Sequence, residues 1–233
     1  MRLSLRRGFA VLACALFGAM LSGALWQIAA NPVGASLPET VAAAMPDSGV
    51  EHPVTAVLLN FRSYDTLLEI GVLVIAAIAG ISMARMPSLE DPDLRTEDSL
   101  LQALQRWFVP LMWLVSGYLL WAGAYRPGGA FQAGAVLAAT GVLMRLGGMP
   151  MGFLQPRRLL RFGLVLGFSV FLLVALVSAL AGDAFLSYPT GMAKWLILII
   201  EIGLTLSIAM VLLSLFVAAP VNDAREPEEG SPP

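Results

Sequence analysis

The sequence contains few of the residues that carry chemistry in soluble enzymes. Among its 233 residues are one cysteine, Cys14, and one histidine, His52. A single cysteine excludes an intramolecular disulfide and a cysteine-based zinc or iron–sulfur site. A single histidine excludes a histidine metal cluster built from this chain alone. We therefore expect no metal site and no cofactor. Catalytic triads, zinc-protease motifs and phosphate loops are also missing, so we do not expect an enzyme.

Charge is also scarce. Charged residues make up 13% of the chain, against about 25% in an average soluble domain. The net charge is −2 and no basic run could neutralise several phosphates, which excludes nucleic-acid binding as the main task. By contrast, 58% of the residues are hydrophobic and the mean hydropathy is +0.79. A chain this short cannot bury so much apolar surface in one water-soluble core, so the composition indicates a membrane protein.

Six segments are long enough to cross about 30 Å of hydrocarbon as helices. We therefore predict an all-α membrane protein, a bundle of about six transmembrane helices. The expected spans are Gly8–Ala29, Tyr64–Ala84, Trp107–Tyr125, Phe131–Met149, Phe162–Ala181 and Trp195–Val217.

The distribution of lysine and arginine predicts the orientation. With six spans, eleven of the 14 basic residues fall on the side that holds both ends of the chain, and only Arg62, Arg126 and Lys194 fall on the other. This bias predicts both termini on the cytoplasmic side of a bacterial inner membrane. The first apolar run is too long for most secretory signals, so we expect it to remain as an uncleaved helix.

The charged stretch after the second span divides the chain. We expect a two-helix unit over residues 1–86 and a cytoplasmic linker with an interfacial helix over residues 87–106. A four-helix unit is expected over residues 107–219, followed by a disordered acidic tail over residues 220–233.

Two carboxylates fall inside predicted spans, where an acid is costly and rare. Counting 1.5 Å per residue from the outer ends, Glu69 lies about 8 Å deep and Glu201 about 10 Å deep. Arg62 and Asp65 share a helical stripe with Glu69, and Lys194 lies seven residues before Glu201. Such charges suit an ion or proton path. The alternative is that the acids only lock helix packing.

A tight outside turn joins the third and fourth spans. Proline fixes one turn dihedral and glycine permits positive φ, which favours a hairpin at Pro127, Gly128 and Gly129. After this turn, small residues recur at every fourth position and let another helix approach closely. They are Ala130, Gly134 and Ala138.

Two segments resemble components of one transporter family. Gly49–Ile78, with its string HPVTAVLLNFRSYDTLLE, resembles the C-terminal tail of the large A subunit of Mrp-type multisubunit Na+/H+ antiporters. It is also similar to the equivalent small subunit of membrane-bound hydrogenases. Gly117–Leu146, with its PGGAF turn, resembles the B subunit of the same antiporters. The chain therefore resembles an A-subunit tail fused to a B subunit, with departures from the family pattern at His52 and Ala130.

This resemblance implies a function and partners. It implies a membrane subunit that helps exchange Na+ for H+, assembled with large antiporter-like subunits and other small membrane subunits. By motif match, Glu69 takes the family's acidic position and Phe131 the aromatic position after the glycine turn. Two alternatives stay open. One is an ion-translocating subunit of a membrane-bound hydrogenase or related respiratory complex. The other is a structural membrane scaffold.

Overall fold

The structure, a computed structural model, describes residues 2–30, 36–83, 99–148, 157–180, 185–189 and 191–218. By its internal contacts the chain forms two compact units, Met1–Ala43 and Ala44–Pro233. The described residues contain helices and turns and no strand, which confirms the predicted all-α class. The predicted boundary between residues 86 and 87, most of the linker and the tail over residues 220–233 lie outside the described residues.

The first unit consists mainly of one long helix. Helix α1 runs over Arg2–Ala30 and contains the first predicted span, and α2 follows over Leu37–Ala44. From Val11 to Ala30 every side chain of α1 is exposed, and this segment is long and apolar enough for a membrane span. Within its own unit, the segment Val11–Ala30 therefore leaves its surface for lipid or other helices.

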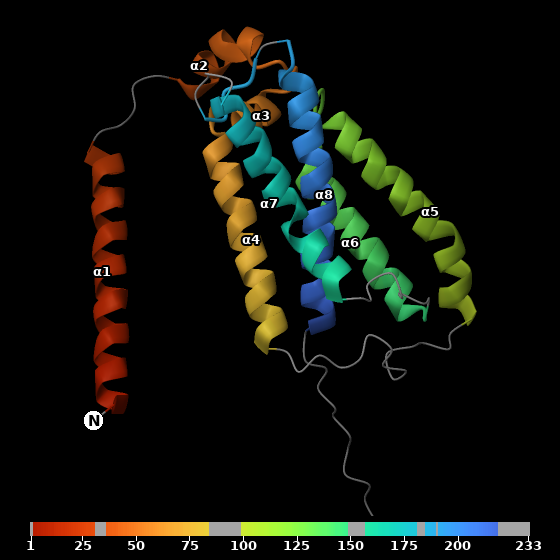
Figure 1. Cartoon of the computed structure of the whole chain (residues 1–233), viewed down its shortest axis with the longest axis horizontal. Coiled ribbons are helices and arrows are strands. Elements are labelled where there is room, and N and C mark those ends of the chain that lie inside the picture. The colour runs from red at the N-terminus through yellow and green to blue at the C-terminus, as the bar shows by residue number, and fades with distance from the viewer. Residues whose placement is uncertain are drawn as a thin grey trace, which may run out of the picture. The chain divides into compact units, whose positions relative to one another are not determined.

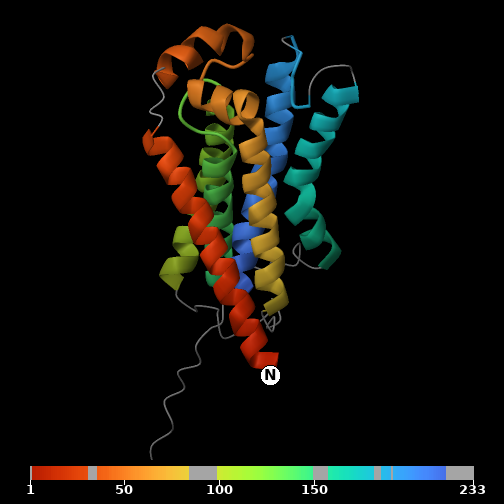
Figure 2. The same cartoon turned by 90° about the vertical axis from the view of Figure 1, so that its left-hand side faces the viewer.

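The second unit is a bundle of five long helices beneath a short helical segment. The short segment comprises η1 (Met45–Asp47), α3 (Pro53–Ala56) and η2 (Val57–Phe61). The long helices are α4 (Ser63–Met83), α5 (Ser99–Ala122), α6 (Ala130–Leu146), α7 (Arg157–Leu180) and α8 (Ala193–Ala218). Helix α8 contacts α4, α5, α6 and α7, and Figure 1 and Figure 2 show it at the centre of the bundle.

The described helices match most of the predicted spans. Four are long and apolar enough to cross a membrane, within α1, α4, α7 and α8. Helix α6 is apolar but shorter, with 17 residues. Helix α5 corresponds to the third predicted span but begins eight residues earlier, at Ser99. Residues 99–106, the end of the linker expected to hold an interfacial helix that leads into the third span, form the first two turns of α5.

Small residues set the spacing around α8. A methyl group added at Gly134 of α6 would lie 2.9 Å from Ile208, and one at Gly141 would lie 2.8 Å from Leu213. On the other side, a methyl group at Gly167 of α7 would lie 3.0 Å from an α8 backbone oxygen. Close backbone approach of this kind provides the van der Waals contact that holds membrane helices together. The predicted small-residue ridge of α6 therefore faces α8.

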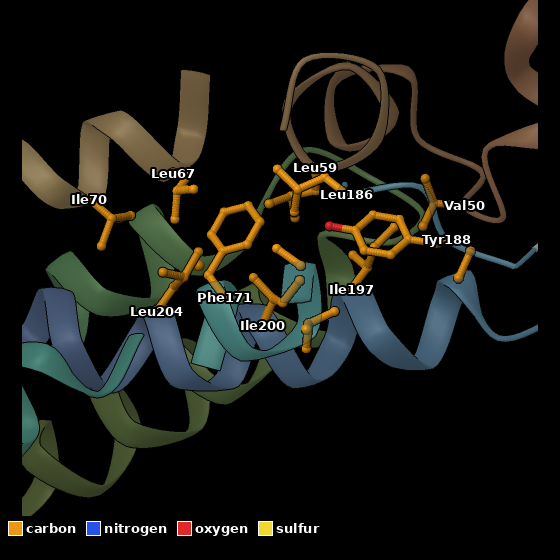
Figure 3. Packing of buried hydrophobic residues seen from close by; sticks show 14 of the residues in the cluster. Val50, Leu59, Leu67, Ile70, Phe171, Leu186, Tyr188, Ile197, Ile200 and Leu204 are labelled. Atoms are coloured by element: carbon orange, nitrogen blue, oxygen red, sulfur yellow. The ribbon is translucent and has the colours of Figure 1, made fainter. Parts of the chain in front are cut away.

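The main apolar cluster lies where α4, α7 and α8 meet the short helical segment. Phe171 of α7 is fully buried there, between Leu67 of α4 and Ile200 of α8 (Figure 3). Leu59 of η2 and Tyr188 of the α7–α8 connection complete the cluster near the predicted outer side. This packing fixes η2 and α4 against α8, the helix that carries Glu201.

Candidate functional site

The two sequence motifs contact each other directly. The backbone amides of Glu51 and His52 both donate to the carbonyl oxygen of Ala124, each at 3.1 Å. The hydroxyl of Thr55 in α3 donates to the carbonyl oxygen of Gly123. Ala124 and Gly123 lie in the turn between α5 and α6. Residues near 50 and residues near 125 thus form one structural unit.

The chain between α3 and α4 contains an unusual wide turn. In η2 the amide of Arg62 donates to the carbonyl oxygen of Val57, five residues earlier, at 2.8 Å. Such π turns are rare, and many of them occur at functional sites. The hydroxyl of Thr66 donates to the carbonyl oxygen of Leu58 at 2.6 Å. The side-chain amide of Asn60 donates to the backbone carbonyl oxygen of Ser48 at 2.8 Å. These bonds fix the short segment over the start of α4.

The turn between α5 and α6 is built on glycine. Gly129 has φ of 106° and ψ of −170°, a region that is essentially restricted to glycine. Its amide donates to the carbonyl oxygen of Leu119 at 2.9 Å. A methyl group at Gly129 would lie 2.9 Å from Oε1 of Glu201, and one at Gly123 would lie 3.1 Å from the same oxygen. The glycines therefore make room for a carboxylate.

The side chain of Glu201, a residue of α8, lies beside the first residue of α6. Its side chain is only 3% exposed, and its carboxylate accepts a hydrogen bond from the backbone amide of Ala130, the first residue of α6. A helix N-terminus presents free N–H groups and the positive end of the helix dipole. Both features stabilise a negative charge. The predicted hairpin and the predicted intramembrane acid are thus parts of one arrangement.

Glu69 and Glu201 line the same cavity, which has a volume of about 250 Å³. Glu69 is exposed on the surface of the bundle, whereas Glu201 lies at the buried end. Polar or backbone-exposing residues supply much of the remaining lining, namely Thr55, Thr66, Gln132, Gly128 and Gly129. The structure thus brings together the two acids that the sequence singled out.

Two threonines line this cavity, and hydrogen bonds to the backbone hold both of their hydroxyl groups. Thr55 and Thr66 each donate their hydroxyl hydrogen to a backbone carbonyl group. The lone pairs of both hydroxyl oxygens remain available as acceptors. The cavity thus has two carboxylates and two hydroxyl groups among apolar side chains that include Leu58, Phe131 and Leu204. Carboxylate and hydroxyl oxygens are ligands that hard cations prefer.

The other predicted charges lie elsewhere. Arg62 and Asp65 form an ion pair with each other, with side chains 68% and 46% exposed, and such exposed pairs contribute about 0–1 kcal/mol. Lys194 donates a hydrogen bond to the hydroxyl of Tyr125 and lies 4.7 Å from the centre of its ring. Neither Lys194 nor the Arg62–Asp65 pair lines the cavity. The expected stripe from Lys194 to Glu201 does not form a common site.

The remaining predicted residues take separate places. Phe131 lines the cavity, Pro127 is exposed in the turn, and Gly134 packs on α8. Sequence reasoning missed Thr55, Thr66 and Gln132 as lining residues. The signal for the threonines was available, because both lie within the motif string that ends in Glu69.

Comparisons with known proteins found relatives of this chain and of its fold. A family model described as a domain related to the MnhB subunit of Na+/H+ antiporter matches residues 100–222, more than half of the chain. A protein of Rhizobium meliloti (strain 1021), named as the probable A/B subunit of a K(+)/H(+) antiporter, is 28% identical over 197 residues. The match covers 72% of this chain and 19% of that relative, so the chain spans about a fifth of the relative's length.

Two solved structures share the fold. The Mrp complex from Dietzia sp. DQ12-45-1b matches with a TM-score of 0.62 and 21% identity, over 95% of this chain and 27% of that chain. The membrane-bound sulfane sulfur reductase, an archaeal respiratory membrane complex, matches with a TM-score of 0.66 and 21% identity. That match covers 92% of this chain and 97% of that chain.

Proposed function

Because the chain belongs to the family of domains related to the MnhB subunit of Na+/H+ antiporters, we propose that it is a membrane subunit of a multisubunit monovalent cation/proton antiporter. The cavity between Glu69 and Glu201 forms part of its ion path. The large antiporter-like subunits and other small membrane subunits are its partners. Na+ and H+ are the transported ions, with K+ as an alternative cation suggested by the name of the Rhizobium relative.

One observation supports the ion path above all. The motif at residues 49–78 and the motif at residues 117–146 are held together by hydrogen bonds, and their junction encloses the cavity. The buried carboxylate of Glu201 lies beside the first residue of α6 and lines the cavity together with the exposed carboxylate of Glu69. Two carboxylates on one cavity suit reversible binding of a cation or proton.

Glu69→Gln and Glu201→Gln test the path. Glutamine keeps the shape and a hydrogen-bonding oxygen but cannot carry charge or release a proton. We expect each change to reduce cation-dependent proton exchange about tenfold or more, equivalent to about 1.4 kcal/mol in the transport barrier. Removing an acid lowers the cost of membrane insertion, so the complex should still assemble. The measurement is cation-driven pH change in inverted vesicles, with immunoblots for every subunit.

Glu51→Gln is the matched control. Glu51 is an exposed carboxylate of the same motif, and its side chain does not line the cavity. Its substitution should leave exchange unchanged. Full exchange in both the Glu69→Gln and Glu201→Gln complexes would favour the scaffold alternative.

A second candidate is an ion-translocating subunit of a respiratory complex. The fold match to the sulfane sulfur reductase complex covers nearly the whole of one of its chains, which makes this alternative specific. Purification of the intact complex in mild detergent separates the two. Antiporter-like membrane subunits alone would support the antiporter, and copurifying redox subunits would support the respiratory complex.

A further inference from the structure

A second hollow lies at the opposite end of the bundle from the two acids. It is an open groove of about 490 Å³ between the end of α4 and the beginning of α7, within the range of about 300–1,000 Å³ usual for ligand sites. We call it the α4–α7 groove. Its walls are formed by Ile78, Ile81, Ser82, Arg161, Phe162 and Val165.

Polarity changes along the α4–α7 groove. Ser82 and Arg161 lie at the ends of their helices, at the predicted cytoplasmic edge of the membrane. Ile78 and Val165 lie one helical turn, about 6 Å, farther into the bundle. Buried Leu164 of α7 forms the floor of the groove. Its carbonyl oxygen accepts a hydrogen bond from the hydroxyl of Ser207 in α8 at 2.6 Å, which fixes the floor against α8. A polar edge above an apolar slot matches a molecule with one polar end and an apolar chain.

The polar edge of this groove is positively charged. Arg161 is exposed, and the first turn of α7 contains no acidic residue. The described carboxylates lie within residues 36–69 and at Glu201. The nearest of these along α4, Glu69, precedes Ile78 by nine residues, or about 13 Å. Arg161 is the charged side chain among the residues that line the groove, and the helix dipole adds positive potential at this end of α7.

We propose that the α4–α7 groove binds an anionic phospholipid of the cytoplasmic leaflet. The phosphate lies against Arg161, and one acyl chain runs along Ile78 and Val165. Basic pockets between membrane helices on the cytoplasmic side are recognised sites for anionic head groups. A zwitterionic phospholipid would satisfy the apolar slot but would leave the positive edge without a net negative partner.

Lipid retention tests the site without depending on transport. The intact complex is purified in mild detergent and incubated with phosphatidylglycerol that carries a photoreactive acyl chain. We expect labelling of residues 78–82 and 161–165, detected by mass spectrometry. Arg161→Gln should reduce the labelling about fivefold, the effect of one basic residue near an anionic surface. Arg161→Lys should keep most of it.

Two further variants control for fold and location. Arg106→Gln removes an exposed arginine on the same predicted side but on α5, and it should leave labelling unchanged. Val165→Trp fills the slot and should block labelling while the charge remains. Equal labelling in Arg161→Gln, or equal labelling by a phosphatidylcholine probe, would overturn the proposal. Crosslinking of the groove residues to another polypeptide, or to α1, would show that protein covers the groove and would also overturn it.

Discussion

At the scale of single residues, the space around the Glu201 carboxylate depends on two neighbouring glycines, which have no side chain to fill it. Gly123 and Gly129 both approach Oε1 so closely that a methyl group on either would lie about as near as a hydrogen-bond partner. The backbone of Gly129 also adopts a conformation that other residues reach only at a cost of about 1–3 kcal/mol. The amide of Ala130 can therefore reach the carboxylate.

We expect Gly129→Ala to impair exchange by displacing the Glu201 carboxylate, and to lower stability by about 1–3 kcal/mol. Thermal unfolding of the purified complex and the vesicle exchange assay measure the two effects. Gly117→Ala is the control, because Gly117 lies within α5 and a methyl group there meets nothing within 4 Å. Alanine favours a helix interior over glycine, so this control should be neutral or slightly stabilising. Exchange at the wild-type rate in Gly129→Ala would show that ion passage does not require the conformation of this turn.

At the scale of helices, the bundle depends on how closely α6 approaches α8. Membrane helices gain little from apolar transfer, since lipid is as apolar as leucine. Their association rests on close contact between surfaces of matching shape. Gly134 and Gly141 of α6 face Ile208 and Leu213 of α8, so the smallest residues of one helix receive the branched residues of the other.

Gly134→Leu should separate these two helices. The added side chain would meet Ile208 and the carbonyl oxygen of Thr205, which lies 3.1 Å from the position of a first methyl group. Overpacking of this kind costs about 1–3 kcal/mol. We expect less intact complex on native gels, while Ala135→Leu, at the next and exposed position, should assemble normally. Equal assembly of both variants would contradict the close-contact role of this face.

The helices were largely predictable from the sequence, and their contacts were not. Runs of apolar residues and the cost of intramembrane acids were enough to locate α4, α8, Glu69 and Glu201. The cavity depends on the wide turn of η2 and on the hydrogen bond from the Thr66 hydroxyl to Leu58. Hydrophobic periodicity predicts neither feature. The spacing of Lys194 from Glu201 predicts a place on the path. The ring of Tyr125, distant in sequence, holds it at the surface instead.

At the scale of the whole molecule, the distribution of basic residues predicts that the two ends of the bundle lie on opposite sides of the membrane. The turn between α5 and α6, the cavity and Lys194 lie at the predicted outer end, and Arg161 lies at the inner end. In this orientation the proposed ion path opens outward through the cavity, and the proposed lipid site faces the cytoplasm.

Cysteine labelling measures this orientation. Pro127→Cys, made in a Cys14→Ser background, places a thiol at an exposed position of the turn. An impermeant maleimide should label it in right-side-out vesicles and not in inverted ones. Ser99→Cys, at the other end of α5, should show the reverse. Labelling of the Pro127→Cys thiol from the cytoplasmic side would show that the topology is the reverse of the predicted one. The cavity would then face the cytoplasm, and the α4–α7 groove would face outward.

The wide turn of η2 has a consequence for how this family can change in length. A π turn holds one more residue than the α turn it replaces, so deleting one residue would restore an ordinary helix. The helices on its two sides would keep their facing, because the π turn already absorbs the extra residue locally. A residue lost or gained elsewhere between residues 53 and 69 has no such turn to absorb it, and it would rotate one side by about 100° relative to the other. Thr55 and Thr66 would then no longer line one cavity. Natural relatives should therefore tolerate substitutions between residues 53 and 69 more readily than changes of length, with loss of one residue at the π turn as the exception, and gaps should gather in the connections between the long helices.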